Sequence, residues 1–155
     1  MTGAPYIAVV GPGQADQPQL AAAEAVGREL AEAGAVVVCG GLGGVMEAAC
    51  RGAQEAGGVT LGLLPGSDRA AANAWVSVAV PTGLGEARNA LVVRAADAVI
   101  AVGGEYGTLS EIALALKTGK PVVGIGTWDL GRDPDPITRA RDGAEAVALA
   151  LAAVR

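Results

Sequence analysis

Short apolar runs alternate along this chain with longer segments in which apolar residues recur every third or fourth position. The apolar runs predict buried strands, and the longer segments predict amphipathic helices. Strands are expected at residues 6–10, 35–39, 59–64, 76–80, 98–102 and 122–125. Helices are expected at residues 18–33, 45–56, 85–96, 108–118 and 143–154. The polar, turn-rich segments 65–75 and 127–139 are expected to be irregular loops.

This alternation indicates one α/β domain over residues 1–155. Strands that are apolar on both faces are typical of a parallel sheet covered by helices on both sides. Right-handed crossovers then give a doubly wound, Rossmann-like sheet, in which ligands bind at the carboxyl ends of the strands. Glycine-rich segments follow predicted strands at residues 11–13, 40–44 and 103–107. We therefore expect these three segments to converge on one site.

Charge and composition exclude several classes of partner and chemistry. The net charge is −5 and no run of Lys or Arg occurs, so binding to nucleic acid or to an anionic membrane surface is not expected. The chain has no histidine, which excludes Ser-His-Asp chemistry and most zinc sites, and we expect no metal site. Cys39 and Cys50 are expected to be small buried apolar residues.

The N-terminal segment lacks the basic region of a signal peptide. No apolar run approaches the roughly 20 residues that cross a bilayer. The sequence thus predicts a cytoplasmic protein.

The segment from Val102 to Glu111 carries the strongest chemical signal. Gly103, Gly104 and Gly107 lie between a predicted strand and a predicted helix. Glycines there let backbone N–H groups approach an anion, and a helix N-terminus adds about half a positive charge. This pattern predicts a cradle for a phosphorylated small molecule.

Two common nucleotide motifs are absent. The segment Gly11-Pro12-Gly13 is followed by Asp16 where the dinucleotide fingerprint needs a third glycine. A phosphate-binding loop of the G-x-x-x-x-G-K-[ST] type does not occur, since Pro121 follows Gly119-Lys120. A dehydrogenase or a P-loop nucleotidase is therefore not predicted.

The pattern Gly103-Gly104-x-x-Gly107-Thr108-x-x-Glu111, with Arg88-Asn89 and a glycine-rich segment upstream, resembles the LONELY GUY superfamily. The resemblance runs from about residue 7 to residue 125. It implies a Rossmann-like fold, usually dimeric, and cleavage of nucleoside 5′-monophosphates into base and ribose 5-phosphate. Arg88 and Glu111 would then be the catalytic residues.

Two departures from that signature indicate a sister branch. Val102 replaces a proline, and Asn89 replaces a lysine. The segment 82–89 looks closer to the branch that includes molybdenum-cofactor carrier proteins. This resemblance implies binding of a phosphorylated pterin as cargo. Two hypotheses follow: a phosphoribohydrolase, and a carrier without turnover. Neither requires a resident cofactor.

Individual residues carry alternative interpretations. Thr108 and Glu111 could form a capping box at a helix start, or Thr108 could bind phosphate while Glu111 acts in catalysis. Arg88 could pair with Glu111 or grip phosphate. Tyr106 could stack on a heterocycle, whereas Trp128 is expected to anchor a loop and Met46 to lie in the core. The predicted ligand-binding residues are Gly11, Gly41, Gly43, Gly44, Asn89, Gly103, Gly104, Tyr106, Gly107 and Thr108.

The helix expected at residues 108–118 is apolar nearly all round, as the run Ala113-Leu114-Ala115-Leu116 shows. Such a helix is buried on more than one side. A homodimer or homotetramer is therefore predicted, because symmetric association is the commonest way to cover it.

Overall fold

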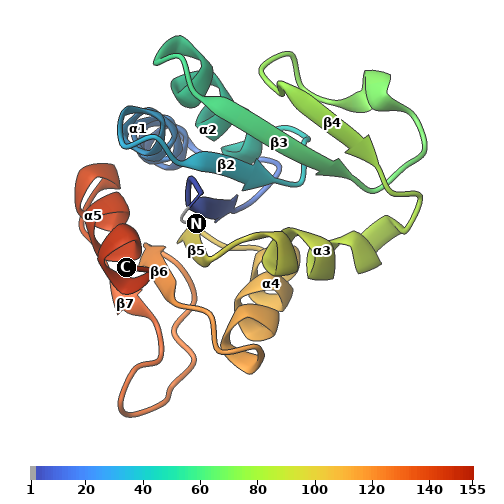
Figure 1. Cartoon of the computed structure of the whole chain (residues 1–155). Coiled ribbons are helices and arrows are strands. Elements are labelled where there is room, and N and C mark those ends of the chain that lie inside the picture. The colour runs from blue at the N-terminus through green and yellow to red at the C-terminus, as the bar shows by residue number, and fades with distance from the viewer. Residues whose placement is uncertain (1–2) are drawn as a thin grey trace.

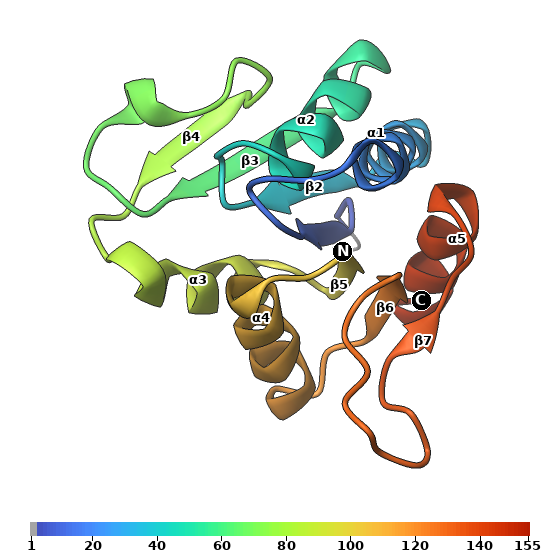
Figure 2. The ribbon, with the colours of Figure 1, turned by 180° about the vertical axis from the view of Figure 1, so that it is seen from behind.

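A parallel sheet of seven strands forms the centre of the computed structural model, which describes residues 3–155 (Figures 1 and 2). The strands are β1 (Tyr6–Val10), β2 (Val36–Cys39), β3 (Val59–Leu64), β4 (Val78–Pro81), β5 (Ala98–Val102), β6 (Val122–Ile125) and β7 (Thr138–Arg139). The helices are α1 (Gln17–Glu32), α2 (Val45–Glu55), α3 (Arg88–Ala95), α4 (Tyr106–Lys117) and α5 (Gly143–Ala153). The predicted α/β, Rossmann-like fold class is confirmed.

The order of the strands places one crevice at the centre of the sheet. The order is β4-β3-β2-β1-β5-β6-β7, and every pairing is parallel. The chain runs outward from β1 to β4 and then returns to β5 on the other side of β1. Ligands of such sheets bind where the strand order reverses, beyond the carboxyl ends of the strands. The segments after β1 and β5 meet at this point.

The two faces of the sheet are covered by different helices (Figure 1). Ile7 and Val9 of β1 pack in the core cluster that α1, α2 and α5 cover. Ala8 and Val10 point to the opposite cluster, beneath α3 and α4. This alternation along one strand explains why the strands are apolar on both faces.

Helices α1 and α2 lie unusually close because glycines stand at their contact. A Cβ added at Gly27 would come within 1.9 Å of the Ala49 carbonyl oxygen, and one added at Gly52 within 2.1 Å of the Glu24 carbonyl oxygen. The N-terminus of α1 is satisfied by its own residues: the Gln19 N–H donates to Asp16 Oδ1 at 2.9 Å, and the Asp16 N–H donates to Gln19 Oε1 at 3.1 Å. This end of α1 is therefore occupied.

Most predicted elements are confirmed, and the differences lie at their ends. The helix expected from residue 85 begins at Arg88, after a 3-10 turn at Gly85–Ala87. Helix α4 begins at Tyr106 rather than at Thr108, because the extended Glu105 is its N-cap. The strand expected at residues 76–80 is found at Val78–Pro81.

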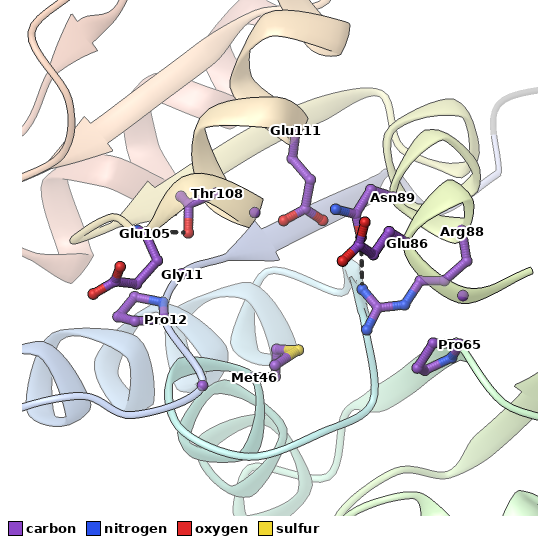
Figure 3. A pocket seen from close by; sticks show the side chains of 13 residues that line it. Gly11, Pro12, Met46, Pro65, Glu86, Arg88, Asn89, Glu105, Thr108 and Glu111 are labelled. Carbon is purple, nitrogen blue, oxygen red and sulfur yellow. Dashed lines mark hydrogen bonds between the residues drawn. The ribbon is translucent and has the colours of Figure 1, made fainter.

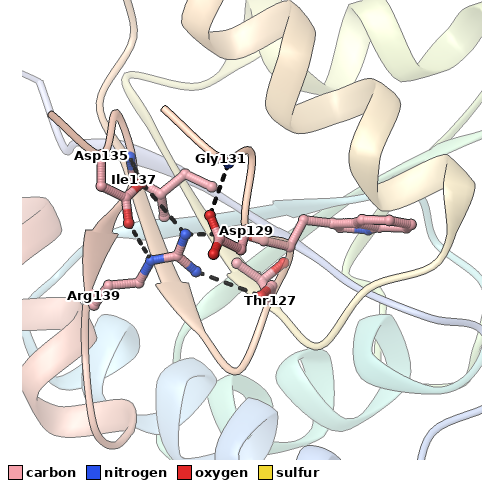
Figure 4. A network of polar contacts seen from close by, with 7 residues as sticks. Thr127, Asp129, Gly131, Asp135, Ile137 and Arg139 are labelled. Carbon is pink, nitrogen blue, oxygen red and sulfur yellow. Dashed lines mark hydrogen bonds and ion pairs between the residues drawn. The ribbon is translucent and has the colours of Figure 1, made fainter. Parts of the chain in front are cut away.

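The loop expected at residues 127–139 ends in the short strand β7 and is held by one arginine (Figure 4). Arg139 Nε donates to Asp135 Oδ2 at 2.8 Å, and its Nη2 donates to the Trp128 carbonyl oxygen at 2.9 Å. The hydrogen bond from Arg139 lowers the pKa of the Asp135 carboxyl. Polar side chains thus order a segment that no hydrophobic periodicity marks.

Both cysteines are buried, as predicted, with their Sγ atoms 3.5 Å apart. Within residues 3–155, no helix is long and apolar enough to span a membrane.

Candidate functional site

A cavity of about 340 Å³ lies beyond the carboxyl ends of β1 and β5 (Figure 3). The buried polar or charged side chains of the described chain are Thr60, Arg88, Thr108 and Glu111. All of them except Thr60 line this cavity. Its lining residues are Gly11, Pro12, Gly13, Met46, Pro65, Gly85, Glu86, Arg88, Asn89, Glu105, Gly107, Thr108 and Glu111. The fold thus concentrates its buried polar groups at one place.

Arg88 is a buried cation that has no anionic partner in the described part of the chain. It is the first residue of α3 and is only 8% exposed. Its Nη1 donates to Asn89 Oδ1 at 2.9 Å, while its buried Nε has no partner. No carboxylate of residues 3–155 lies within 4.0 Å of the guanidinium. Because a helix N-terminus also disfavours a cation, the site favours an incoming anion.

Asn89 connects α3 to the start of α4. Its Nδ2 donates to Ser110 Oγ at 3.1 Å, and Ser110 Oγ donates to the Gly107 carbonyl oxygen at 2.7 Å. The chain of hydrogen bonds from Arg88 through Asn89 therefore positions the guanidinium relative to the α4 N-terminus. Asn89 and Gly107, both predicted ligand-binding residues, also line the cavity.

Glu111 lies in the second turn of α4 and faces the same space as Arg88 (Figure 3). Its side chain is 7% exposed. Burial raises the pKa of the Glu111 carboxyl to about 7, although the positive charge of Arg88 opposes that rise. Of the alternatives for Arg88, direct pairing with Glu111 is not found, since no ion pair joins them in the part of the chain that the structure describes.

The capping box expected for Thr108 and Glu111 is wrong. Thr108 is the third residue of α4, and its Oγ1 accepts a hydrogen bond of 3.3 Å from the Glu105 N–H. Glu111 lies one turn further on and takes no part in the cap. The helix starts earlier than expected, so the pattern Thr-x-x-Glu has a different position in it.

The glycines of the three loops shape the site in different ways. Gly11 lines the cavity, and a Cβ added to it would come within 2.5 Å of the Val102 carbonyl oxygen, so it allows β1 and β5 to end close together. Gly44 has a φ of +65° and precedes α2, whose N-terminus has no side-chain cap. In that first turn, the Val45 N–H donates to the Pro12 carbonyl oxygen at 3.1 Å, and the next amide belongs to Met46, which lines the cavity.

Other predicted glycines lie outside the lining. Gly41, Gly43, Gly44, Gly103 and Gly104 are not among the lining residues. Gly103 has a φ of +64°, and a Cβ there would meet Gln19 Nε2 at 2.4 Å. Gly104 lies beneath Trp128, whose Nε1 would be 2.6 Å from an added Cβ. Their contact with a ligand stays a prediction.

The two aromatic side chains near the site have different roles. Trp128 Nε1–H donates to the Glu105 carbonyl oxygen at 3.1 Å, which confirms the prediction that Trp128 anchors its loop. Tyr106 stacks on Trp128 with ring centroids 5.9 Å apart, yet it is 80% exposed. Tyr106 lines a neighbouring cavity of about 570 Å³ between α3 and α4.

Several lining residues were not expected from the sequence. Met46 was expected in the core but lines the cavity, and its position two residues after the glycine-rich segment 40–44 is the signal that marks it. Glu86 and Glu105 lie at the exposed rim. Nothing in the local pattern around Pro65 or Glu86 indicates that the chain folds back to the crevice.

Comparison with known proteins gives a consistent result over the whole chain. The sequence model of the SLOG cluster4 family matches residues 4–151. The chain is similar to the molybdenum cofactor binding protein of Rippkaea orientalis, with 36% identity, full coverage of both chains and a TM-score of 0.94. It is also similar to the Moco carrier protein of Chlamydomonas reinhardtii, with 39% identity, 98% coverage of each chain and a TM-score of 0.88. An uncharacterized protein of Archaeoglobus fulgidus is 44% identical over 119 residues, which are 77% of this chain and 78% of the relative.

Proposed function

The chain belongs to the SLOG cluster4 family, and we propose that it binds a phosphorylated heterocycle, with a pterin phosphate such as the molybdenum cofactor as cargo. The observation that carries this proposal is the buried Arg88, whose guanidinium lines a cavity and has no anionic partner among residues 3–155. A buried cation is costly unless a counter-ion arrives. A phosphate group supplies that counter-ion.

The phosphate has a defined place in this proposal. The N-termini of α2 and α4 border the cavity through Met46 and Gly107, and both carry backbone amides of a first helical turn. Such amides and an arginine together form a strong phosphate site. The N-terminus of α1, which binds phosphate in dinucleotide-binding folds, is blocked here by its own capping residues. The N-terminus of α4 is closed in the same way by the capping box of Glu105 and Thr108. In this proposal, the phosphate therefore binds between Arg88, the Thr108 hydroxyl and the first-turn amides of α2.

Carriage is favoured over hydrolysis by the relatives. Two of them, at 36% and 39% identity, are described as a molybdenum cofactor binding protein and a Moco carrier protein. The departures Val102 and Asn89 from the hydrolase signature support the same choice. In this proposal, the cavity holds its ligand without turnover, and Arg88 and Glu111 are binding residues.

The test is a binding experiment with product analysis. Molybdenum cofactor released from a molybdoenzyme is titrated into the wild-type protein and into Arg88→Met, with the exposed Arg94→Met on the same helix as the control. Carriage predicts tight binding that is lost in Arg88→Met alone, with the cofactor recovered intact. Separate incubations with nucleoside monophosphates are analysed for free base. Release of base by the wild type but not by Glu111→Ala would instead establish the phosphoribohydrolase.

We also propose that the chain forms a homo-oligomer through α3 and α4. Leu91 and Tyr106 on these helices are 38% and 80% exposed, and Leu84 just before them is 51% exposed. Large apolar side chains that are exposed on neighbouring helices favour association. Sedimentation analysis tests this: a dimer or tetramer is expected, and a monomer at working concentrations would contradict it.

A further inference from the structure

We infer that the Glu111 carboxylate recognises a 2-amino-4-oxopyrimidine edge, the paired N–H donors that guanine and pterins share. This inference rests on the proposed function, because it concerns the same ligand whose phosphate Arg88 binds. It assigns to Glu111 the selection of the heterocycle, which is a different role from catalysis.

Glu111 is a buried acceptor that receives no hydrogen bond from residues 3–155. Its side chain is 7% exposed, and the causes of its altered proton affinity are burial and the charge of Arg88, with no hydrogen bond among them. The carboxyl group borders the cavity, and a carboxylate without donors is disfavoured once a ligand excludes water from it. Because residues 3–155 supply none, a ligand that fills the cavity is favoured when it brings its own donors.

The other carboxylates of the lining do not share this need. Glu86 and Glu105 also face the cavity, but both are exposed, so water can solvate them. Arg88 is the one cation among the lining residues. A ligand that is only an anion would satisfy Arg88 and leave Glu111 unpaired. A ligand that carries an anion at one end and paired N–H donors at the other satisfies both.

The geometry of a carboxylate selects the edge. Its two oxygens accept two parallel hydrogen bonds. Guanine offers N1–H beside a 2-amino group, and a pterin offers N3–H beside the same amino group. Adenine offers one donor beside an acceptor, and hypoxanthine lacks the amino group. A site that is built to pair with a donor rejects the analogue that lacks it.

The experiment compares GMP, IMP and AMP by calorimetric titration into the wild-type protein. All three carry the same ribose phosphate, so differences in affinity report the base. The expected order is GMP first, with IMP weaker by about ten-fold, since one charge-assisted hydrogen bond is lost, and AMP weaker still. Equal affinities for the three nucleotides would overturn the inference.

A second variant tests the residue itself. The amide of Glu111→Gln offers one acceptor and one donor, which match adenine, and it no longer accepts from both N1–H and the 2-amino group of guanine. The affinity for GMP should fall by about ten-fold and the affinity for AMP should rise, so that the preference reverses. Binding of inorganic phosphate, which depends on Arg88, should be retained or become tighter, because a negative charge near Arg88 is removed, and it shows that the variant is folded. A preference for GMP that survives in Glu111→Gln would overturn the inference.

Binding of inorganic phosphate distinguishes a failure of the proposed function from a failure of this inference alone. If the wild type and Arg88→Met bind inorganic phosphate equally, or if neither binds it, the proposed function and this inference are both wrong. If phosphate binding depends on Arg88 while GMP, IMP and AMP bind equally, the inference alone falls.

Discussion

The guanidinium of Arg88 lies directly against the backbone of Gly40. A Cβ added at Gly40 would come within 2.5 Å of Arg88 Nη1 and 2.8 Å of its Cζ. Gly40 directly follows β2, so the arginine lies against the chain at the carboxyl end of this strand. Gly40 therefore acts on the site by leaving room for a cation.

The first prediction concerns this contact. In Gly40→Ala, the added methyl group displaces the end of a flexible side chain, so the fold persists while Arg88 loses its position. Affinity for inorganic phosphate should fall by roughly ten-fold, since a charge-assisted hydrogen bond is weakened. Titration calorimetry measures this. Gly66→Ala, where an added Cβ has no neighbour within 4 Å, is the control and should bind like the wild type.

The second prediction separates stability from binding at Arg88. Without ligand, Arg88→Met removes a buried cation from a helix N-terminus, so the free energy of unfolding should rise by about 0.5–1 kcal/mol. With saturating phosphate, the wild type should gain stability and the variant should not. Urea unfolding with and without phosphate measures both effects. A large loss of stability in the ligand-free variant would show that Arg88 serves the fold instead.

The third prediction concerns the pH dependence of stability. The pKa of Glu111 is raised in the folded protein from 4.5 to about 7, so the folded state holds a proton that the unfolded state releases. The stabilising contribution of the Glu111 proton to the free energy of unfolding is therefore fully present below pH 4.5 and is lost as the pH rises through about 7. The wild type should lose up to about 3 kcal/mol of unfolding free energy over this range, relative to a chain without this group.

Glu111→Gln provides the comparison for this prediction. The neutral amide does not titrate, so the difference in unfolding free energy between the variant and the wild type should grow in favour of the variant between about pH 5 and about pH 8. Denaturant unfolding at a series of pH values measures it. A difference that stays constant over that range would show that the carboxyl group titrates normally.

The order of elements was predictable because the strands are continuous apolar runs bounded by glycine, as at Ala98–Val102. Their doubly wound arrangement followed from general rules of parallel sheets. The start of α4 was not predictable in this way, because Glu105 caps the helix although Thr108 is the more usual capping residue type. Strand β7 has two residues, too few for any period to appear.

The site was predictable in part for a similar reason. Arg88, Thr108 and Glu111 stand in a recognisable motif, and the fold brings them to one cavity. Their burial was not predictable, because it depends on where Pro65 and Met46, distant in the chain, close the walls. The lack of an ion pair between Arg88 and Glu111 was not predictable either, because the spacing of residues along two helices does not determine whether their side chains meet.

The last prediction concerns the end of the helix that begins with Arg88. Lys120 Nζ donates to the carbonyl oxygens of Val93 at 2.8 Å and of Arg94 at 3.0 Å, and also to that of Ala96. Val93 and Arg94 lie in the last turn of α3, and Ala96 is its C-cap, whose N–H also donates to the Val93 carbonyl oxygen. The lysine thus adds donors at a helix end where carbonyl groups lack intrahelical partners. Lys120→Met should therefore lower the free energy of unfolding by about 1–2 kcal/mol.

Lys117→Met is the matched control, since Lys117 is exposed at the end of α4 and should change stability by less than about 0.5 kcal/mol. Denaturant unfolding compares the two variants with the wild type. Because α3 carries Arg88 at its other end, fraying from the Lys120 side should also increase hydrogen exchange at the amides of Val92 and Val93. Equal stability of the two lysine variants would show that water replaces the lysine at these carbonyls without cost, and that the position of Arg88 does not depend on this cap.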